Sequence, residues 1–133
     1  MKVYLSVPMI ANRRLERARV IANAIRDSGH EVTSPWVLGS VEGHDPNVLN
    51  IFERDMLGAE RCDAIVADVS QPSIGVGMEI MAAYKAGKFV VLVAMRGSTI
   101  SRMLLHMKRK ELVEFDDDKE LYSNLVKTLK PKA

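Results

Sequence analysis

Short apolar segments rich in β-branched residues alternate along this chain with longer segments of helical periodicity. The predicted strands are residues 2–7, 30–34, 63–69, 88–94 and 112–115, and the predicted helices are residues 12–28, 47–61, 78–86, 98–108 and 117–129. The alternation predicts an α/β fold with a doubly wound five-stranded parallel sheet, flavodoxin- or Rossmann-like, in the strand order 2-1-3-4-5. Ligands of such sheets bind beyond the carboxyl ends of the strands, between strands one and three.

Length and charge limit the possible functions. The length suits one domain, residues 1–133, and 47% hydrophobic against 27% charged residues is an ordinary globular balance. A net charge of +2 is too small to indicate nucleic acid or a membrane as partner. The N-terminal apolar run is too short for a signal peptide, and no run approaches the length of a membrane span. We therefore expect a cytoplasmic protein.

The cysteine and histidine content argues against a metal site. A single cysteine, Cys62, excludes an internal disulfide and a Cys-based zinc site, and we expect it in the core. His30, His44 and His106 lie on different predicted elements without metal-ligand spacing. We therefore expect no metal.

The segment after the third predicted strand carries the strongest functional signal. Residues 70–79 read Ser-Gln-Pro-Ser-Ile-Gly-Val-Gly-Met-Glu. A glycine-rich turn that leads into a helix presents free backbone N–H groups and a positive dipole end, which favour a phosphate or carboxylate. The turn is neither a P-loop nor a complete dinucleotide fingerprint, and an ordinary capped connection explains it about as well.

Two carboxylates are predicted to face the crevice. Glu79 lies in the first turn of the helix after the glycine-rich segment and is the only charged residue between Asp68 and Lys85. Asp55 takes a core-facing place in the apolar stripe of helix 47–61. The stripe consists of Val48, Ile51, Phe52 and Ala59. A buried carboxylate is costly without a partner or ligand, and two at one crevice suit glycosidic cleavage. A dipole-stabilised surface Glu and a capping or salt-bridged Asp are the structural alternatives.

Several hydroxyl groups complete the candidate site. Tyr4 and Ser6 lie on one face of the first strand, near its carboxyl end. Tyr4 either orients a catalytic carboxylate or is a core tyrosine with its hydroxyl at the rim, and Ser6 is a candidate substrate-binding residue. On the fourth predicted helix, Ser98 is expected as the N-cap, with Ser101 one turn later. Asp116 or Asp117 is expected to cap the last helix.

From Tyr4 to about Met103 the sequence resembles the nucleoside 2-deoxyribosyltransferase superfamily, and most closely its 2′-deoxynucleoside 5′-monophosphate N-hydrolase branch. The core of the resemblance is Pro-Ser-x-Gly-Val-Gly-x-Glu at residues 72–79. It implies that Glu79 is a nucleophile that attacks C1′ and forms a deoxyribosyl-enzyme intermediate. It also implies that Asp55 contacts the sugar or assists the leaving base, and that Tyr4 orients the nucleophile.

The resemblance further implies how the substrate's phosphate is held. Ser73 and Gly75 match phosphate-binding positions, and Ser101 is similar to a serine that reaches the neighbour's phosphate across a homodimer interface. Near Ser101, an apolar stripe fits either such a partner or the chain's own sheet. The stripe consists of Ile100, Met103, Leu104 and Met107. No cofactor is implied.

The segment after the first strand departs from the hydrolase pattern. Residues 7–10, Val-Pro-Met-Ile, stand where those hydrolases have Gly-Ser-x-Arg, and Arg13 or Arg14 could supply the missing charge. We expect hydrolysis of a small-molecule deoxynucleotide to a free base and 2-deoxyribose 5-phosphate. The alternatives are a base-exchanging deoxyribosyltransferase, a phosphoribohydrolase acting on ribonucleotides, and a nucleotide-binding module without turnover.

Overall fold

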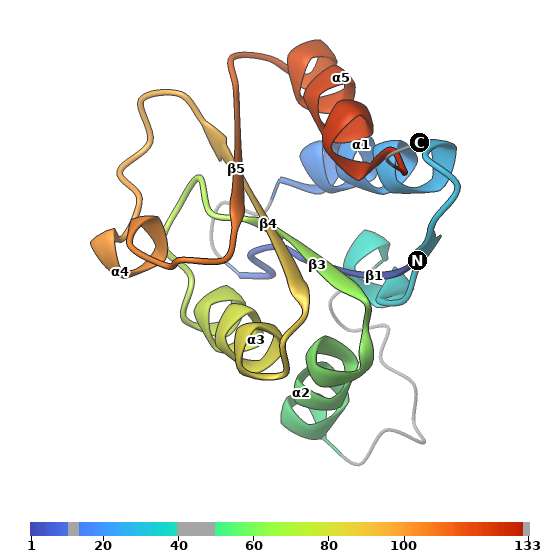
Figure 1. Cartoon of the computed structure of the whole chain (residues 1–133), viewed down its shortest axis with the longest axis vertical. Helices are drawn as coiled ribbons and strands as arrows, with labels where there is room; N and C mark the ends of the chain where they lie inside the picture. The colour runs from blue at the N-terminus through green and yellow to red at the C-terminus, as the bar shows by residue number, and fades with distance from the viewer. Residues whose placement is uncertain (11–13, 40–49, 132–133) are drawn as a thin grey trace.

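The computed structural model describes residues 1–10, 14–39 and 50–131. These residues form a five-stranded parallel sheet in the order β2-β1-β3-β4-β5, which confirms the predicted fold class and strand order (Figure 1). The strands are β1 (Lys2–Ser6), β2 (Glu31–Val32), β3 (Ala64–Asp68), β4 (Phe89–Met95) and β5 (Glu111–Phe115). Every residue of β3 is buried, as expected for the central strand of a sheet covered on both faces.

Helices cover the two faces of the sheet in pairs. They are α1 (Leu15–Asp27), the 3₁₀ helix η1 (Pro35–Leu38), α2 (Ile51–Arg61), α3 (Ile74–Lys85), α4 (Arg102–Leu105) and α5 (Asp118–Leu129). Figure 1 shows α1 beside α5 on one face and α2 beside α3 on the other. Strand residues alternate between the faces, so Val3 and Leu5 pack with α1 and α5, whereas Tyr4 packs on the α2 and α3 side. None of the helices in the described ranges is long and apolar enough to cross a membrane.

The ends of several helices differ from the sequence prediction. Helix α3 begins four residues early, at Ile74, because the Ser73 hydroxyl accepts from the backbone N–H of Val76 and caps it. Helix α2 begins at Ile51 because Asn50 caps it. Residues 12 and 47–49, included in the predicted helices, lie outside the described ranges. The 3₁₀ helix η1 occupies residues 35–38, at the start of a segment whose Pro and Gly residues are typical of a surface loop.

The fourth helix is much shorter than predicted. The chain turns at Gly97, with a φ of +89°, and reaches Ser101 before α4 begins. Ser98 donates its backbone N–H to Met95 in this turn and is not a helix cap, so that prediction was wrong. The turn and the segment after it account for the late start of α4, which then ends at Leu105.

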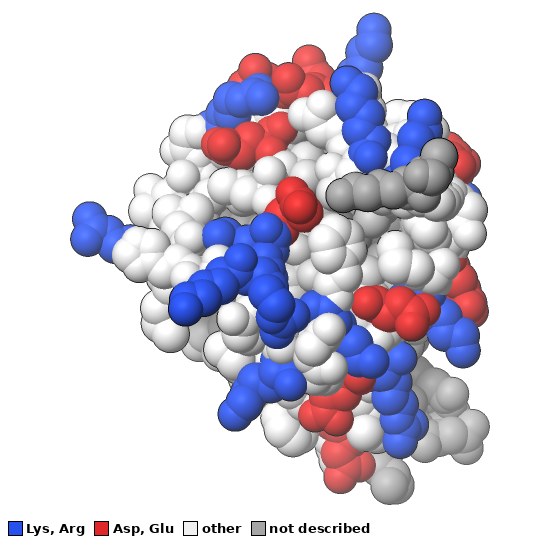
Figure 2. All heavy atoms as spheres, viewed as in Figure 1, with Lys and Arg blue, Asp and Glu red and all other residues white. Residues whose placement is uncertain are grey.

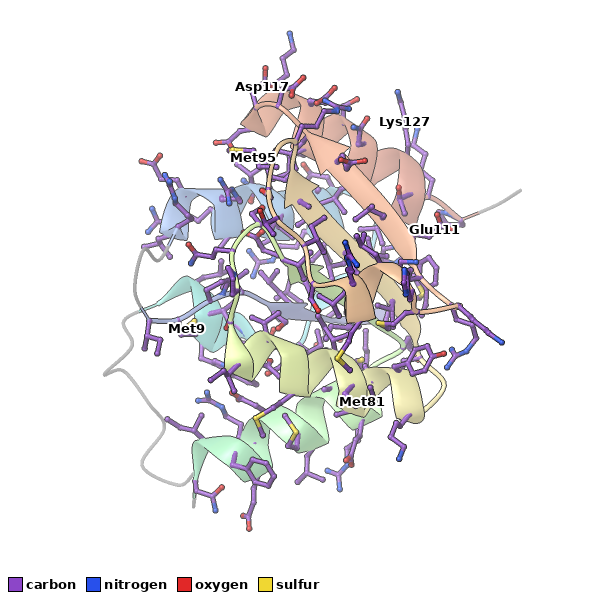
Figure 3. The ribbon with its side chains drawn as sticks, turned by 90° about the vertical axis from the view of Figure 1, so that its left-hand side faces the viewer. Met9, Met81, Met95, Glu111, Asp117 and Lys127 are labelled. Carbon is purple, nitrogen blue, oxygen red and sulfur yellow. The ribbon has the colours of Figure 1, made fainter. Side chains whose placement is uncertain are left out.

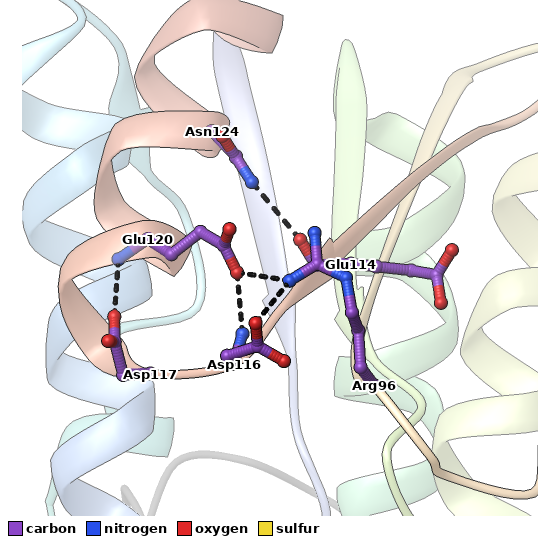
Figure 4. A network of polar contacts seen from close by, with 6 residues as sticks. All are labelled: Arg96, Glu114, Asp116, Asp117, Glu120 and Asn124. Carbon is purple, nitrogen blue, oxygen red and sulfur yellow. Dashed lines mark hydrogen bonds and ion pairs between the residues drawn. The ribbon is translucent and has the colours of Figure 1, made fainter.

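Helix α5 is fixed at its start by the network shown in Figure 4. The Asp117 side chain accepts from the backbone N–H of Glu120, which confirms one of the two predicted caps. The Glu120 carboxylate in turn accepts from the backbone N–H of Asp116 and from Arg96, which follows β4. These bonds tie the loop after β4 to the junction of β5 and α5.

The predicted apolar stripe of α2 was wrong. Ile51 and Phe52 are 57% and 60% exposed, and of that stripe's described members only Ala59 is buried. The side of α2 that meets β1 carries small residues, since a Cβ on Gly58 would lie 2.7 Å from Cε2 of Tyr4. The small residues let α2 approach the sheet closely and leave its large apolar residues outside.

Candidate active site

A cavity of about 620 Å³ opens beyond the carboxyl end of β1, between η1, α2 and the start of α3. Its position between the first and third strands is the predicted one for an open parallel sheet. Among the predicted site residues, those that line the cavity are Tyr4, Asp55, Ser73, Gly75 and Glu79. Three separate elements, β1, α2 and α3, therefore bring these side chains to one place.

Glu79 is a buried carboxyl group in the middle of α3, not in its first turn as predicted, because the helix begins at Ile74. It is 9% exposed, and its pKa is raised from an ordinary 4.5 to about 7. Burial is the largest cause, and the nearby Asp55 adds to it, whereas Tyr4, Ser6 and Arg54 lower the pKa. A carboxyl with such a pKa changes charge near neutral pH, which suits a nucleophile or proton-transfer group.

The hydroxyls of Tyr4 and Ser6 are buried beside Glu79. Both are near enough to lower the pKa of Glu79, although neither makes a hydrogen bond of ordinary length and angle within the described part of the chain. Burial, followed by the charge of Glu79, raises the pKa of Tyr4 far above its usual range. Tyr4 therefore stays protonated and can donate to the Glu79 carboxylate, which is the arrangement expected of an orienting tyrosine.

Asp55 lies half-buried on α2 and is paired with its neighbour Arg54, a residue that was not among the predicted site residues. The Arg54 Nε donates to Asp55 Oδ1 at 2.8 Å, and its guanidinium lies 4.1 Å from the ring centroid of Trp36. Both Arg54 and Trp36 line the cavity. The available signals were the position of Arg54 directly before Asp55 and the presence of a single tryptophan in the chain.

The start of α3 presents groups suited to an anion. Ser73 caps the helix, and the first N–H groups of any helix lack partners within it. A Cβ on Gly75 would lie 4.0 Å from Glu79 Oε1, so Gly75 lies directly beside this carboxyl. The preceding turn is anchored by Asp68, which accepts from the backbone N–H of Ser70 and pairs with the buried Arg17.

The segment after β1 forms an apolar wall of the cavity. Val7, Met9 and Ile10 line it, and Figure 3 shows Met9 beyond the end of β1. Arg14 lines a separate hollow beside α1 and not this cavity, while Arg13 lies outside the described residues. Among the described residues that line the cavity, Arg54 is the one cation.

Ser101 does not line the cavity that holds Glu79. It lies on the surface, in a neighbouring apolar hollow of about 510 Å³ between α3 and α4. The two hollows share residues 71–74 and Val76. Ser101 is therefore separated from the predicted phosphate site of its own chain by the start of α3, and its role across an interface stays a prediction.

The remaining candidate ligands are scattered. His30 contacts the backbone oxygen of Leu129 and the N-terminal amine, His106 ends α4, and His44 lies outside the described residues. Cys62 is buried in the core, as predicted. Within residues 1–10, 14–39 and 50–131, no group of three or more His, Cys, Asp or Glu side chains is arranged to hold a metal.

Comparison with known proteins identifies relatives over most of the chain. The model of the nucleoside 2-deoxyribosyltransferase family matches residues 3–126. A protein of Methanococcoides burtonii is 41% identical over 79% of this chain and 89% of its own length. A protein of Thermofilum pendens is 34% identical over 94% of this chain and 92% of its own length. Both bear the provisional name 2′-deoxynucleoside 5′-phosphate N-hydrolase 1.

Solved structures with the same fold are more distant in sequence. A 2-deoxyribosyltransferase from Bacillus psychrosaccharolyticus superimposes with a TM-score of 0.69 at 23% identity, over the whole of both chains. A CMP N-glycosidase from Clostridium botulinum gives 0.66 at 21% identity, over 94% of this chain and 98% of that one. At these identities the likeness establishes the fold.

Proposed function

The protein belongs to the nucleoside 2-deoxyribosyltransferase family, and we propose that it hydrolyses the N-glycosidic bond of 2′-deoxynucleoside 5′-monophosphates. The products are a free base and 2-deoxyribose 5-phosphate, and the whole chain acts as one domain. The observation that carries the proposal is the buried Glu79 carboxyl, with a pKa of about 7, beside Tyr4 and Asp55 in one cavity. The names of the two relatives support the same reaction.

Glu79 is the nucleophile in this proposal. Its carboxylate oxygen bonds to C1′ while the C1′–N bond breaks, and the electron pair leaves with the base, which takes up a proton from solvent. Tyr4 donates to Glu79 and fixes its orientation, and Asp55 contacts the sugar or assists the departing base. Water then attacks C1′, its proton passes to Asp55 and from there to solvent, and Glu79 is released as a carboxylate.

The substrate's phosphate is held at the start of α3. Ser73, Gly75 and the free N–H groups there provide donors, and the helix dipole favours the negative charge. Ser6 was predicted to bind substrate, but its hydroxyl is buried beside Glu79 and does not line the cavity, so any contact with substrate would need the cavity to open further. Binding energy from the phosphate would fix C1′ against Glu79 and so contribute to the rate.

A panel of substrates tests the proposal. Ribo- and deoxyribonucleosides, with and without a 5′-phosphate, are incubated with the protein, and released base is measured by chromatography. Deoxynucleoside monophosphates should be cleaved much faster than the matching nucleosides. Cleavage of ribonucleotides instead would indicate a phosphoribohydrolase, and thermal stabilisation without product would indicate a binding module.

The apolar wall at residues 7–10 favours a second candidate, base exchange between unphosphorylated deoxynucleosides. That wall has no cation to hold a phosphate, and Val7, Met9 and Ile10 suit an uncharged group. In this reaction a second base, not water, releases the sugar from Glu79. Equal or faster reaction of nucleosides, with a new nucleoside formed when a different free base is added, would establish it.

The active unit in our proposal is a symmetric homodimer in which Ser101 reaches the partner's phosphate site. Exposed apolar side chains surround the hollow beside α3 and α4: Ile74 is 87% exposed and Met103 is 78% exposed. Apolar residues gathered in this way are typical of contact surfaces, and methionine is common on adaptable ones.

A further inference from the structure

Arg54 is held in a fixed position by two different contacts. Its Nε donates to Asp55 Oδ1 at 2.8 Å, and its guanidinium covers the ring of Trp36 at 4.1 Å. The side chains of Arg54 and Asp55 are only 17% and 19% exposed. Adjacent residues on a helix do not normally face each other, so Arg54 reaches Asp55 by folding back across Trp36. An arginine that only faced solvent would have no reason to fold back in this way, so the conformation reflects the contacts with Asp55 and Trp36.

The row of contacts continues from Arg54 to the reactive carboxyl. The edge of one ring of the Tyr4–Trp36 pair meets the face of the other, with centroids 6.1 Å apart, and Gly58 leaves space for the Tyr4 ring against α2. Tyr4 in turn lies beside Glu79. Arg54 is therefore connected to Glu79 both through packed rings and directly through the shared cavity.

Two carboxylates in one partly buried cavity repel each other. The charged and titratable groups that face Glu79 are Tyr4 from β1 and both Asp55 and Arg54 from α2, with the uncharged Ser6 hydroxyl beside them. Among the described residues, the cavity contains no other cation that could offset the charge of Asp55. Without Arg54, ionisation of Asp55 would oppose ionisation of Glu79 more strongly.

We infer that Arg54 is a positioning residue, which fixes the Asp55 carboxylate on α2 and offsets its charge so that Asp55 and Glu79 can both be ionised in one cavity. Its catalytic use rests on the function proposed above, but its effect on Glu79 does not. Arginine suits the role better than lysine because its planar guanidinium can stack on Trp36 while it donates to a carboxylate.

The test follows the ionisation of Glu79 in two ways. One is the acid limb of kcat/KM against pH. The other is the ¹³C NMR titration of the Glu79 carboxyl in labelled protein, assigned with Glu79→Gln. Arg54→Met should move both inflections upward by roughly half a pH unit or more, with little change in Tm. Arg54→Lys keeps the positive charge, so its two inflections should lie close to those of the wild type.

Further variants separate this effect from general damage. Asp55→Asn should lower the Glu79 inflection, and the double variant Arg54→Met with Asp55→Asn should lie near or below the wild type because the repulsion is gone. Arg61→Met is the matched control, because Arg61 is exposed at the end of the same helix. It should leave both Glu79 inflections unchanged. Arg54→Gln serves if Arg54→Met does not fold.

The outcomes distinguish the two proposals. An NMR inflection that stays within about 0.2 units in Arg54→Met or Arg54→Gln, or that moves equally in Arg61→Met, overturns the role of Arg54. If the wild type releases no base from any nucleotide, the proposed function fails, and the NMR titration still decides whether Arg54 controls Glu79.

Discussion

Glu79 shows how the burial of one residue sets both its chemistry and its effect on stability. Burial raises the pKa of its carboxyl to about 7, so the ionised form that a nucleophile requires is populated only near and above neutral pH. The same burial makes the ionised form unfavourable for the fold. Activity and stability should therefore change in opposite directions through the same pH range.

The first prediction concerns turnover. Glu79→Ala should lower kcat by several orders of magnitude while the far-UV circular dichroism and Tm show an intact fold, because the nucleophile is removed and no other carboxyl can take its place on α3. A variant that keeps more than about a tenth of wild-type turnover, a barrier change of only ~1.4 kcal/mol, would contradict the assignment.

The second prediction concerns stability and pH. Because the pKa of Glu79 is higher in the folded chain than its ordinary 4.5, the folded state binds this proton more tightly than the unfolded state. The associated stability is fully present below pH 4.5 and is lost as pH rises through 7. Glu79→Gln should therefore be more stable than the wild type at pH 8, by on the order of 1–3 kcal/mol, with the gain disappearing toward pH 4.5.

Urea unfolding at a series of pH values measures this difference. Glu60→Gln, which removes an exposed carboxylate of α2, is the control and should show no comparable trend. A gain for Glu79→Gln that is the same at pH 5 and pH 8 would show that burial does not shift this carboxyl.

At the scale of elements, the site depends on how closely α2 approaches β1. Gly58 is the contact point, because a Cβ there would lie 2.7 Å from Cε2 and 3.0 Å from Cδ2 of the fully buried Tyr4 ring. The ring cannot move aside easily in a packed interior. The place of the Tyr4 ring, beside Glu79, therefore depends on a glycine on another element.

The third prediction follows from this contact. Gly58→Ala should destabilise the fold by about 1–3 kcal/mol through overpacking, even though alanine is the better helix former, and should lower kcat more than it raises KM. Gly77→Ala on α3 is the matched control. A Cβ at Gly77 meets nothing within 4 Å, so this variant should be neutral or slightly stabilising. Chemical unfolding and steady-state kinetics on both variants decide the matter, and equal behaviour would contradict the role of Gly58.

At the scale of the whole molecule, several large apolar side chains are exposed around α3 and α4. Figure 2 shows uncharged surface on the left, where Figure 1 places α4, with basic side chains projecting from it and beside it. The exposed large side chains of these helices include Ile74, Met78, Met81 and Met103. A two-fold contact there would cover them and bring Ser101 toward the partner's site.

The fourth prediction tests the shared site by complementation. Glu79→Ala and Ser101→Asp, whose carboxylate should repel a phosphate, are each expected to be nearly inactive. If Ser101 acts across a two-fold interface, a mixed dimer has one site with both changes and one with neither. Random mixing after denaturation and refolding should then restore about a quarter of wild-type sites.

If Ser101 serves its own chain, every site of the mixed dimer carries one change and no activity returns. Mass spectrometry must show that heterodimers are present in the mixture. A monomer by light scattering would contradict the homodimer directly.

The sequence was sufficient for the order of the strands and for the position of Glu79. Strand order followed from the alternation of strands and helices, because parallel strands need crossovers of one hand. Glu79 was identifiable because its signal is local: the cap at Ser73, the two glycines and the carboxyl lie within seven consecutive residues, although the glycines form the start of α3 and not the turn that was predicted. Tyr4 was indicated by its place on the first strand and by the family resemblance. Asp55 was indicated by the resemblance and by an apolar stripe that proved wrong, because α2 leaves Ile51 and Phe52 exposed.

The face that α2 presents to the sheet, and the partners Arg54 and Trp36, became visible only in the folded chain. Periodicity identifies apolar residues but not which of them find a neighbour, and α2 packs through Gly58 while Ile51 and Phe52 stay exposed. Trp36 and Arg54 are 18 positions apart in a sequence that contains no local sign of their contact. Such contacts depend on the fit of side chains from separate elements, and this fit exists only after the sheet has brought those elements together.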